Sequence, residues 1–107
     1  MAKPLHVQII PRARALIEDE DHWCRGGLAR DKYGVSVLPT DSEARKRCAF
    51  GALIAAAHEA AGDMRQAYEF AILAMGSTRG AATLVAVNDA EGHAAALALL
   101  DEAMAGT

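Results

Sequence analysis

The chain has 107 residues, a length that suits a single domain spanning residues 1–107 and excludes two. Hydrophobic residues make up 52% of it and charged residues 23%, which is ordinary for a soluble globular protein, and aromatic residues are scarce at 5%. The net charge of −3 and the absence of a long basic run exclude the basic stripe that nucleic-acid-binding proteins carry, so no nucleic-acid partner is expected.

The first predicted helix lies near the start of the chain. Apolar residues recur there at helical spacing, at Ile9, Ala13, Leu16 and Ile17. Pro11 either begins the helix at its first position or kinks a longer helix that starts near Leu5. We therefore expect a helix from Pro11 to Asp19 and leave open whether it extends back to Leu5.

A long glycine-containing segment follows, residues 18–41. Asp31 is placed to begin a type I turn, and residues 35–38 suit a short extended piece. A loop of this length is uncommon inside a compact domain. We expect either a short helix over residues 27–31 or an anchor supplied by Trp23, the lone tryptophan.

Residues 40–63 predict a central helix. Thr40 and Glu43 have the spacing of a capping box, so the helix is expected to begin there and to end at Gly62. Residues 48–57 carry no charge on any face, and a helix that is apolar all round is normally enclosed by other elements. The expected core residues of this helix are Cys48, Gly51, Ala52 and Ala55.

Two further helices are predicted in the second half of the chain. Asp63 caps a helix that runs through Met75. Residues 83–87 are apolar and partly β-branched, so periodicity does not separate a strand from a buried helical turn. Asn88 and Asp89 offer a cap for a last helix that reaches about Met104.

Together these elements predict an all-α fold. It is a small array of about four helices around the buried central helix, with one long ordered loop. The alternative is a short strand or hairpin that involves residues 35–38 and 83–87.

An ordered set of short motifs is shared with a known family. The set comprises a tryptophan, a glycine, Ala-x-Asp, a glycine turn, Ala-x-x-x-Cys-x-x-Gly-Ala-Leu and a later Asn-Asp, here at Trp23, Gly26, Ala29, Asp31, Gly34, Ala44, Cys48, Gly51, Ala52, Leu53, Asn88 and Asp89. In this order the chain resembles a family of small bacterial and bacteriophage proteins classed as a domain of unknown function. The resemblance implies a compact helical fold and no assigned reaction. Arg47 and Val87 stand where that family often has an aromatic residue, so any binding surface that those aromatics line is altered here.

Catalytic and metal chemistry find little support in the sequence. Cys48 and His58 lie on one predicted helix, roughly 15 Å apart along its axis, which is too far for a thiol–imidazole pair. His22 or His93 could still approach Cys48 in space, although a small buried packing residue is the favoured interpretation of this cysteine. His22 and Cys24 lack a zinc-site spacing, and no Cys-x-x-Cys occurs. We therefore assign no catalytic residue, no metal site and no cofactor.

Five residues remain candidates for ligand binding: Trp23, Arg30, Asp31, Asn88 and Asp89. In the functional interpretation the polar residues form a small acidic pocket, Trp23 supplies a wall and Arg30 a counter-charge. In the structural interpretation Asp31 fixes a turn while Asn88 and Asp89 cap the last helix. Capping alone explains the last two residues, so the structural interpretation is favoured.

For function, the surplus of small apolar residues and the lack of a catalytic motif favour a non-enzymatic interaction module. It would act as a homo-oligomer or with a protein partner, through an apolar face of the last helix formed by Leu97, Leu100 and Met104. The alternative is a small ligand-binding protein or enzyme with a pocket near Trp23, Asp31, Asn88 and Asp89.

The expected location is the cytoplasm. Two cysteines are too few for a disulfide scaffold, and the N-terminal segment lacks the long apolar region of a signal peptide. The apolar runs are also broken well before the ~20 residues that a membrane-spanning helix needs, so no membrane association is expected.

Overall fold

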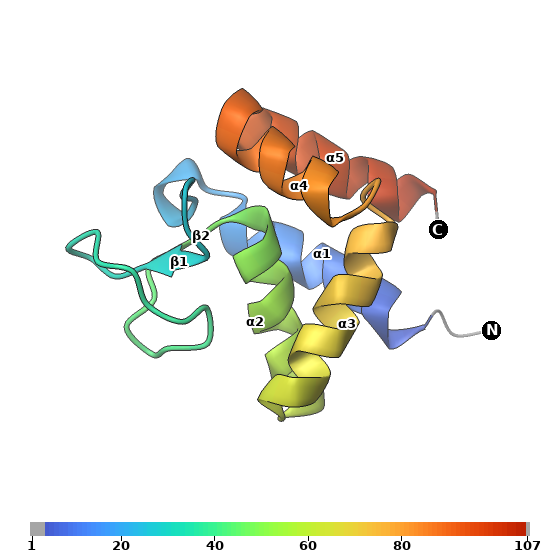
Figure 1. Cartoon of the computed structure of the whole chain (residues 1–107), viewed down its shortest axis with the longest axis horizontal. Coiled ribbons are helices and arrows are strands. Elements are labelled where there is room, and N and C mark those ends of the chain that lie inside the picture. Colours follow the sequence, from blue (N-terminus) through green and yellow to red (C-terminus); the bar gives the residue numbers. More distant parts are fainter. Residues whose placement is uncertain (1–3, 107) are drawn as a thin grey trace.

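The computed structural model describes residues 4–106 and is predominantly helical (Figure 1). In chain order its elements are α1 (Leu5–Ile17), the 3-10 turn η1 (Glu20–His22), β1 (Ala29–Arg30), β2 (Lys46–Arg47), α2 (Ala49–Ala61), α3 (Met64–Gly76), α4 (Ala81–Ala86), the π-helical turn η2 (Val87–Glu91) and α5 (His93–Ala105). The predicted all-α class is confirmed, with one small two-stranded sheet inside the long loop.

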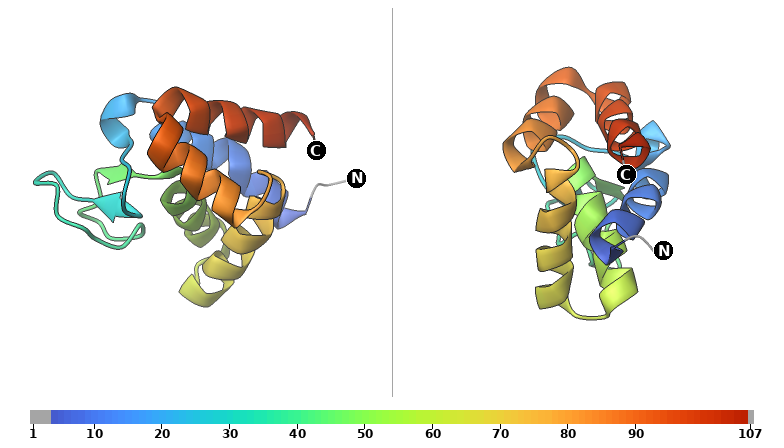
Figure 2. Two further views of the ribbon diagram at one scale, coloured as in Figure 1. Left: turned by 45° about the horizontal axis from the view of Figure 1, so that its top comes forward. Right: turned by 90° about the vertical axis from the view of Figure 1, so that its right-hand side faces the viewer.

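Helix α2 lies at the centre of the protein, as its uncharged sequence predicts. α1 and α3 pack along it, and α4 and α5 cross over one end of the α2–α3 pair (Figures 1 and 2). Residues 51–57 are all buried, and Cys48 before the helix is buried with them. The side chains of α2 therefore form one core with those of α1, α3 and α5.

Helix α1 takes the longer of the two forms that the sequence allows. It begins at Leu5, contains Pro11 and ends at Ile17, two residues before the expected end at Asp19. Val7, Ile9 and Ile10 are buried, so apolar burial stabilises the turns before the proline. Asp19 instead accepts a hydrogen bond from the Asp21 N–H and begins η1.

The predicted start of the central helix is wrong. α2 begins at Ala49, and Cys48 is its N-cap, with Sγ accepting a hydrogen bond from the Gly51 N–H at 3.2 Å. The Thr40–Glu43 capping box does not form, because the backbone ahead of Cys48 pairs with β1. The N–H groups of Arg45 and Cys48 donate to the carbonyls of Arg30 and Leu28. Sheet pairing with a distant segment thus replaces the expected first turns.

The second half of the chain confirms one predicted helix and corrects another. α3 runs from Met64 to Gly76, with the Asp63 side chain accepting from the Arg65 N–H as expected. Residues 83–87 are helical, so the strand alternative for them is wrong. α5 begins at His93 after Gly92, so Asn88 and Asp89 do not cap it and lie instead in η2.

The loop between η1 and α2 is built on β1. β1 pairs antiparallel with β2 in the register Ala29↔Arg47, and on its other side Arg30 bridges Ser36. Trp23 bridges Arg47 in parallel fashion beyond β2. The expected helix over residues 27–31 is therefore wrong, whereas the anchor at Trp23 is present because the indole is buried. We call residues 24–47 the β-loop; it lies at the opposite end of the molecule from both termini (Figures 1 and 2).

Helix α5 stabilises its own chain. Leu100 is fully buried, and Leu97 and Met104 pack against the same core. Leu100 is therefore used inside the protein, whereas Leu97 and Met104 are only partly covered, so the contact between subunits expected through this face stays a prediction. Among the described residues no helix combines the length and the apolarity needed to cross a bilayer.

Gly51 allows the β-loop to lie directly on α2. A Cβ at this position would stand 2.0 Å from the carbonyl oxygen of Leu28, well inside contact distance. Gly76, at the end of α3, would meet no atom within 4 Å. The two helical glycines therefore differ in what surrounds them, which is the backbone of the β-loop at Gly51 and open space at Gly76.

We expect Gly51→Ala and Gly76→Ala to change stability in opposite directions. Gly76→Ala should stabilise the protein by about 0.5–1 kcal/mol, because alanine favours the helical backbone. Gly51→Ala should destabilise it by about 2 kcal/mol or more, because the clash with Leu28 is with backbone and exceeds that gain. Urea unfolding of both variants checks this, and equal stabilisation by the two substitutions would disprove the close contact.

Candidate functional site

The side chain of Asn88 joins three segments of the chain. Its Oδ1 accepts hydrogen bonds from Trp23 Nε1 at 2.7 Å and from the Ala49 N–H at 2.9 Å. Its Nδ2 donates to the Cys24 carbonyl at 3.2 Å and to Asp89 Oδ1 at 2.9 Å. Asn88 is only 1% exposed, and these four bonds use both its donors and both acceptor positions. The amide therefore fixes the β-loop, the start of α2 and η2 to one another.

Asp89 makes a second connection between η2 and the β-loop. Its Oδ1 accepts from the Gly26 N–H at 3.1 Å, and its backbone carbonyl accepts from Arg25 Nη1 at 3.2 Å. Gly26 has a φ of +76°, a conformation that favours glycine and that directs its N–H toward the carboxylate. The Arg25 guanidinium lies over the Trp23 ring, 5.2 Å from its centroid. Gly26 and the preceding Arg25 are thus both held by η2, and Arg25 also contacts Trp23.

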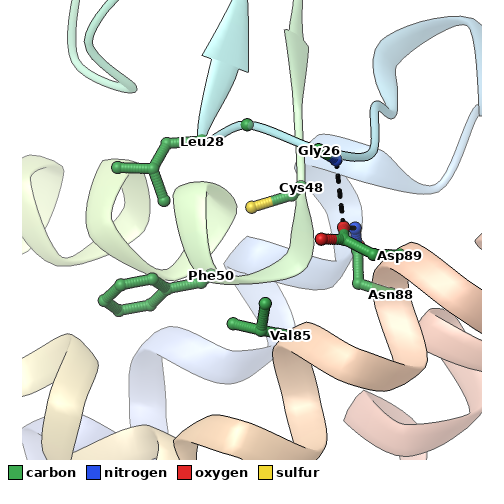
Figure 3. Close-up of a pocket in the computed structure, with 8 residues that line it drawn as sticks. Gly26, Leu28, Cys48, Phe50, Val85, Asn88 and Asp89 are labelled. Carbon is green, nitrogen blue, oxygen red and sulfur yellow. Dashed lines mark hydrogen bonds between the residues drawn. The ribbon is translucent and has the colours of Figure 1, made fainter.

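A half-open pocket of about 250 Å³ lies between the β-loop, α2 and η2 (Figure 3). Apolar walls come from three different elements, and polar atoms come from the thiol and η2. The lining residues are Gly26, Gly27, Leu28, Cys48, Phe50, Val85, Asn88 and Asp89. One-turn π-helices such as η2 are frequent at functional sites, and this one places two polar residues at the pocket.

The structure brings three of the five predicted site residues together and leaves two apart. Trp23, Asn88 and Asp89 form one cluster, in which Trp23 supports Asn88 from outside the pocket. Asp31 accepts from the N–H groups of Tyr33 and Val35, so it fixes a turn in the β-loop. Arg30 donates to the Gly34 carbonyl and is not a lining residue.

Sequence reasoning missed most of the pocket wall. Leu28, Phe50 and Val85 were not predicted to lie near Asp89, because they are single apolar residues in three segments whose pairing is set only by the tertiary fold. The sequence marks Gly26 only as part of the family pattern and Gly27 only as one glycine of the long loop. The one available signal was the Asn-Asp pair, two polar residues directly after an apolar stretch.

Both thiols are buried and free. Burial, together with the nearby Cys48, raises the pKa of Cys24 to about 11. Burial also raises the pKa of Cys48, with the carboxylate of Asp89 acting in the same direction. The two thiols are therefore neutral at physiological pH and poor nucleophiles.

In the part of the chain that the structure describes, neither thiol is hydrogen-bonded to a histidine. The ring of His93 packs near Trp23, with 5.5 Å between ring centroids, and its Nε2 is 2.6 Å from the Ile17 carbonyl. A carbonyl can only accept, so this nitrogen carries the hydrogen. Within residues 4–106, no group of three or more His, Cys, Asp or Glu side chains is arranged to hold a metal ion.

Arg47 and Val87, which stand where the family often has an aromatic residue, have structural roles here. Arg47 donates from Nε to the Pro39 carbonyl at 2.8 Å and so holds the far end of the β-loop. Val87 packs against the helical core. Neither residue lines the pocket.

Three apolar side chains of the β-loop, those of Tyr33, Val35 and Leu38, are exposed, and we call them its outer face. Tyr33 is 79% exposed, Val35 58% and Leu38 59%. Their backbone is nevertheless fixed, because the Asp31 N–H donates to the Val35 carbonyl and the Val37 N–H to the Ala29 carbonyl. The exposed side chains therefore project from a backbone that hydrogen bonds hold in place.

Fold and site together define a small helical protein whose β-loop is tied to a π-helical turn beside a half-open pocket. The chain belongs to the family of unknown function DUF6197, which matches residues 1–106. No curated protein and no solved structure matches it.

Replacing Asn88 by alanine is expected to destabilise the protein by about 3 kcal/mol or more. The change leaves the Trp23 indole N–H, the Ala49 N–H and the Cys24 carbonyl without their partner, and each buried unpaired group costs about 1–3 kcal/mol. Urea unfolding measures the effect, with exposed Gln66→Ala as control, for which a change below about 0.5 kcal/mol is expected. Similar small effects for both variants would contradict the role of the amide.

The native thiols are expected to react slowly with iodoacetamide at pH 8. A pKa of about 11 for Cys24, against an ordinary 9.0, lowers its thiolate fraction about 100-fold. Because the folded pKa is the higher one, the associated stability is present below pH 9 and is lost as the pH rises toward 11. Alkylation followed by mass spectrometry measures the rate for the folded protein and, in urea, for the unfolded protein. Equal rates in the two conditions would contradict the raised pKa of the thiols.

Proposed function

We propose that this protein is a non-enzymatic interaction module, working as a homo-oligomer or with a protein partner, and that its contact surface is the outer face of the β-loop. The observation that carries the proposal is the exposure of Tyr33, Val35 and Leu38 on a fixed frame. Apolar side chains held in water by an ordered backbone are typical of binding surfaces. Tyrosine in particular is enriched at the centres of interfaces.

The backbone adds a second means of contact. Val35 and Val37 direct their carbonyl and N–H toward β1, so the N–H and C=O of Ser36 between them face the outer edge. An edge of this kind pairs with an extended segment of another chain. Here the edge offers one donor and one acceptor, both from Ser36. These groups are enough to orient a partner and too few to bind it alone.

The outer face is small, which favours a loop that inserts into a partner over a flat interface. Stable complexes bury roughly 800 Å² on each partner, more than three side chains provide. The β-loop stands out from the helices at one end of the molecule (Figure 2), a shape that suits insertion into a concave partner surface. Neutral, buried thiols accord with a reducing cytoplasm, which we propose as the location.

The triple variant Tyr33→Ser, Val35→Ser, Leu38→Ser is expected to lose association by tenfold or more while keeping its fold, because these side chains lie mostly in solvent. The matched control is Ile72→Ser with Leu73→Ser, which removes similarly exposed apolar groups from α3. Sedimentation velocity measures self-association. Photo-crosslinking in the native host, from p-benzoylphenylalanine placed at position 33 or at position 72, detects a partner.

The crosslinked mass separates the two forms of the proposal. A product of twice 11.3 kDa indicates a second copy, and any other discrete mass indicates a different protein. The proposal fails if wild-type protein stays monomeric and position 33 crosslinks no more than position 72.

A further inference from the structure

The pocket beside η2 contains one formal charge. Among its lining residues only Asp89 is ionic, and no lysine, arginine or histidine lines it. Arg25 donates to the backbone carbonyl of Asp89, and the Arg30 guanidinium lies beside Gly26 and Gly27. Among residues 4–106 the Asp89 carboxylate forms no ion pair. Because burial keeps the Cys48 thiol protonated, the pocket presents a lone negative charge.

The two oxygens of Asp89 have different surroundings. Oδ1 accepts from the Gly26 N–H and from Asn88 Nδ2, which fixes the carboxylate in place. Both hydrogen bonds that the described residues donate to the carboxylate go to Oδ1, and Figure 3 shows Oδ2 directed toward the space between Cys48 and Val85. Asn88 has no bonding capacity left for a ligand, since all four of its bonds are made inside the protein. A ligand donor entering the pocket therefore meets Oδ2.

The remaining walls suit an apolar stem. Leu28, Phe50 and Val85 stand around the opening in Figure 3, each from a different part of the chain. A volume of about 250 Å³ lies below the roughly 300–1,000 Å³ of pockets that enclose drug-sized ligands. The occupant that fits is short, with an apolar body and one cationic end.

We propose that this pocket binds an alkylammonium group, with the ammonium donating to Asp89 Oδ2 and an aliphatic stem of roughly four carbons lying against Leu28, Phe50 and Val85. Both a free small amine and the side chain of a lysine carry this group. The site is independent of the outer face of the β-loop, which lies on other residues.

Two-dimensional amide NMR of the 11.3 kDa protein tests the proposal, with n-butylammonium chloride as the probe. We expect saturable shifts of the Gly26, Gly27 and Asp89 amides, and at least tenfold weaker binding of n-butanol, which has the stem without the charge. Shifts that do not saturate, or equal binding of the alcohol, would overturn the proposal.

Two variants separate the charge from the shape of the pocket. Asp89→Asn keeps an oxygen for Gly26 and Asn88 and removes the charge, so binding should weaken at least tenfold. Val85→Phe fills the opening from a helix position that is 42% exposed, so it should block binding without unfolding the protein. Unchanged binding in both variants, with spectra that show the native fold, would place the probe elsewhere and refute the site.

A comparison of ligands identifies the source of the group. Nα-acetyl-lysine methylamide binding at least as tightly as n-butylammonium indicates a lysine side chain of a polypeptide. Binding that is tenfold weaker or worse indicates a free amine, because the attached backbone is then excluded from the pocket. Either result upholds alkylammonium recognition, and binding of neither compound rejects it. The triple β-loop variant should bind the probe as wild type does, so the outcome does not depend on the interaction surface.

Discussion

The hydrogen bonds of one buried side-chain amide, that of Asn88, hold the β-loop, the start of α2 and η2 together. Asn88 links Trp23 and Cys24 at the start of the β-loop to Ala49 at the start of α2. A buried polar side chain is tolerated only when its bonding capacity is met, and here it is met in full. The pocket depends on the same arrangement, since its walls belong to the segments that the amide holds.

The contact between the β-loop and α2 is complementary on both sides. The Leu28 carbonyl accepts from the Cys48 N–H, and Gly51 one turn later leaves room for that same peptide. Asp89 then closes the arrangement by accepting from Gly26. Small residues and backbone groups thus bring the loop close to the helices, while larger apolar side chains are left to line the space that remains.

The sequence predicts those parts of the fold that local patterns determine. Residues 48–57 are uncharged, and all of them except the half-buried Phe50 lie in the core. Asp63 caps α3 because the helix begins directly after it. The start of α2 could not be predicted, because a complete capping pattern at Thr40 and Glu43 competes with sheet pairing that only the distant β1 supplies. The predicted role of Asn88 as a helix cap was wrong for a related reason. A polar residue before a helix has the pattern of a cap, and its three distant partners leave no local trace.

The sequence separation of 65 between Trp23 and Asn88 has a consequence for the order of events during synthesis. Chains fold as they emerge, and the segments of α1, α2 and α3 all precede the residue that anchors the β-loop. Until η2 has left the ribosome, the indole lacks its hydrogen-bond partner and the β-loop lacks its attachment to η2. The nascent protein therefore passes through a stage in which Tyr33, Val35 and Leu38 are already made while Asn88 does not yet hold the start of their loop.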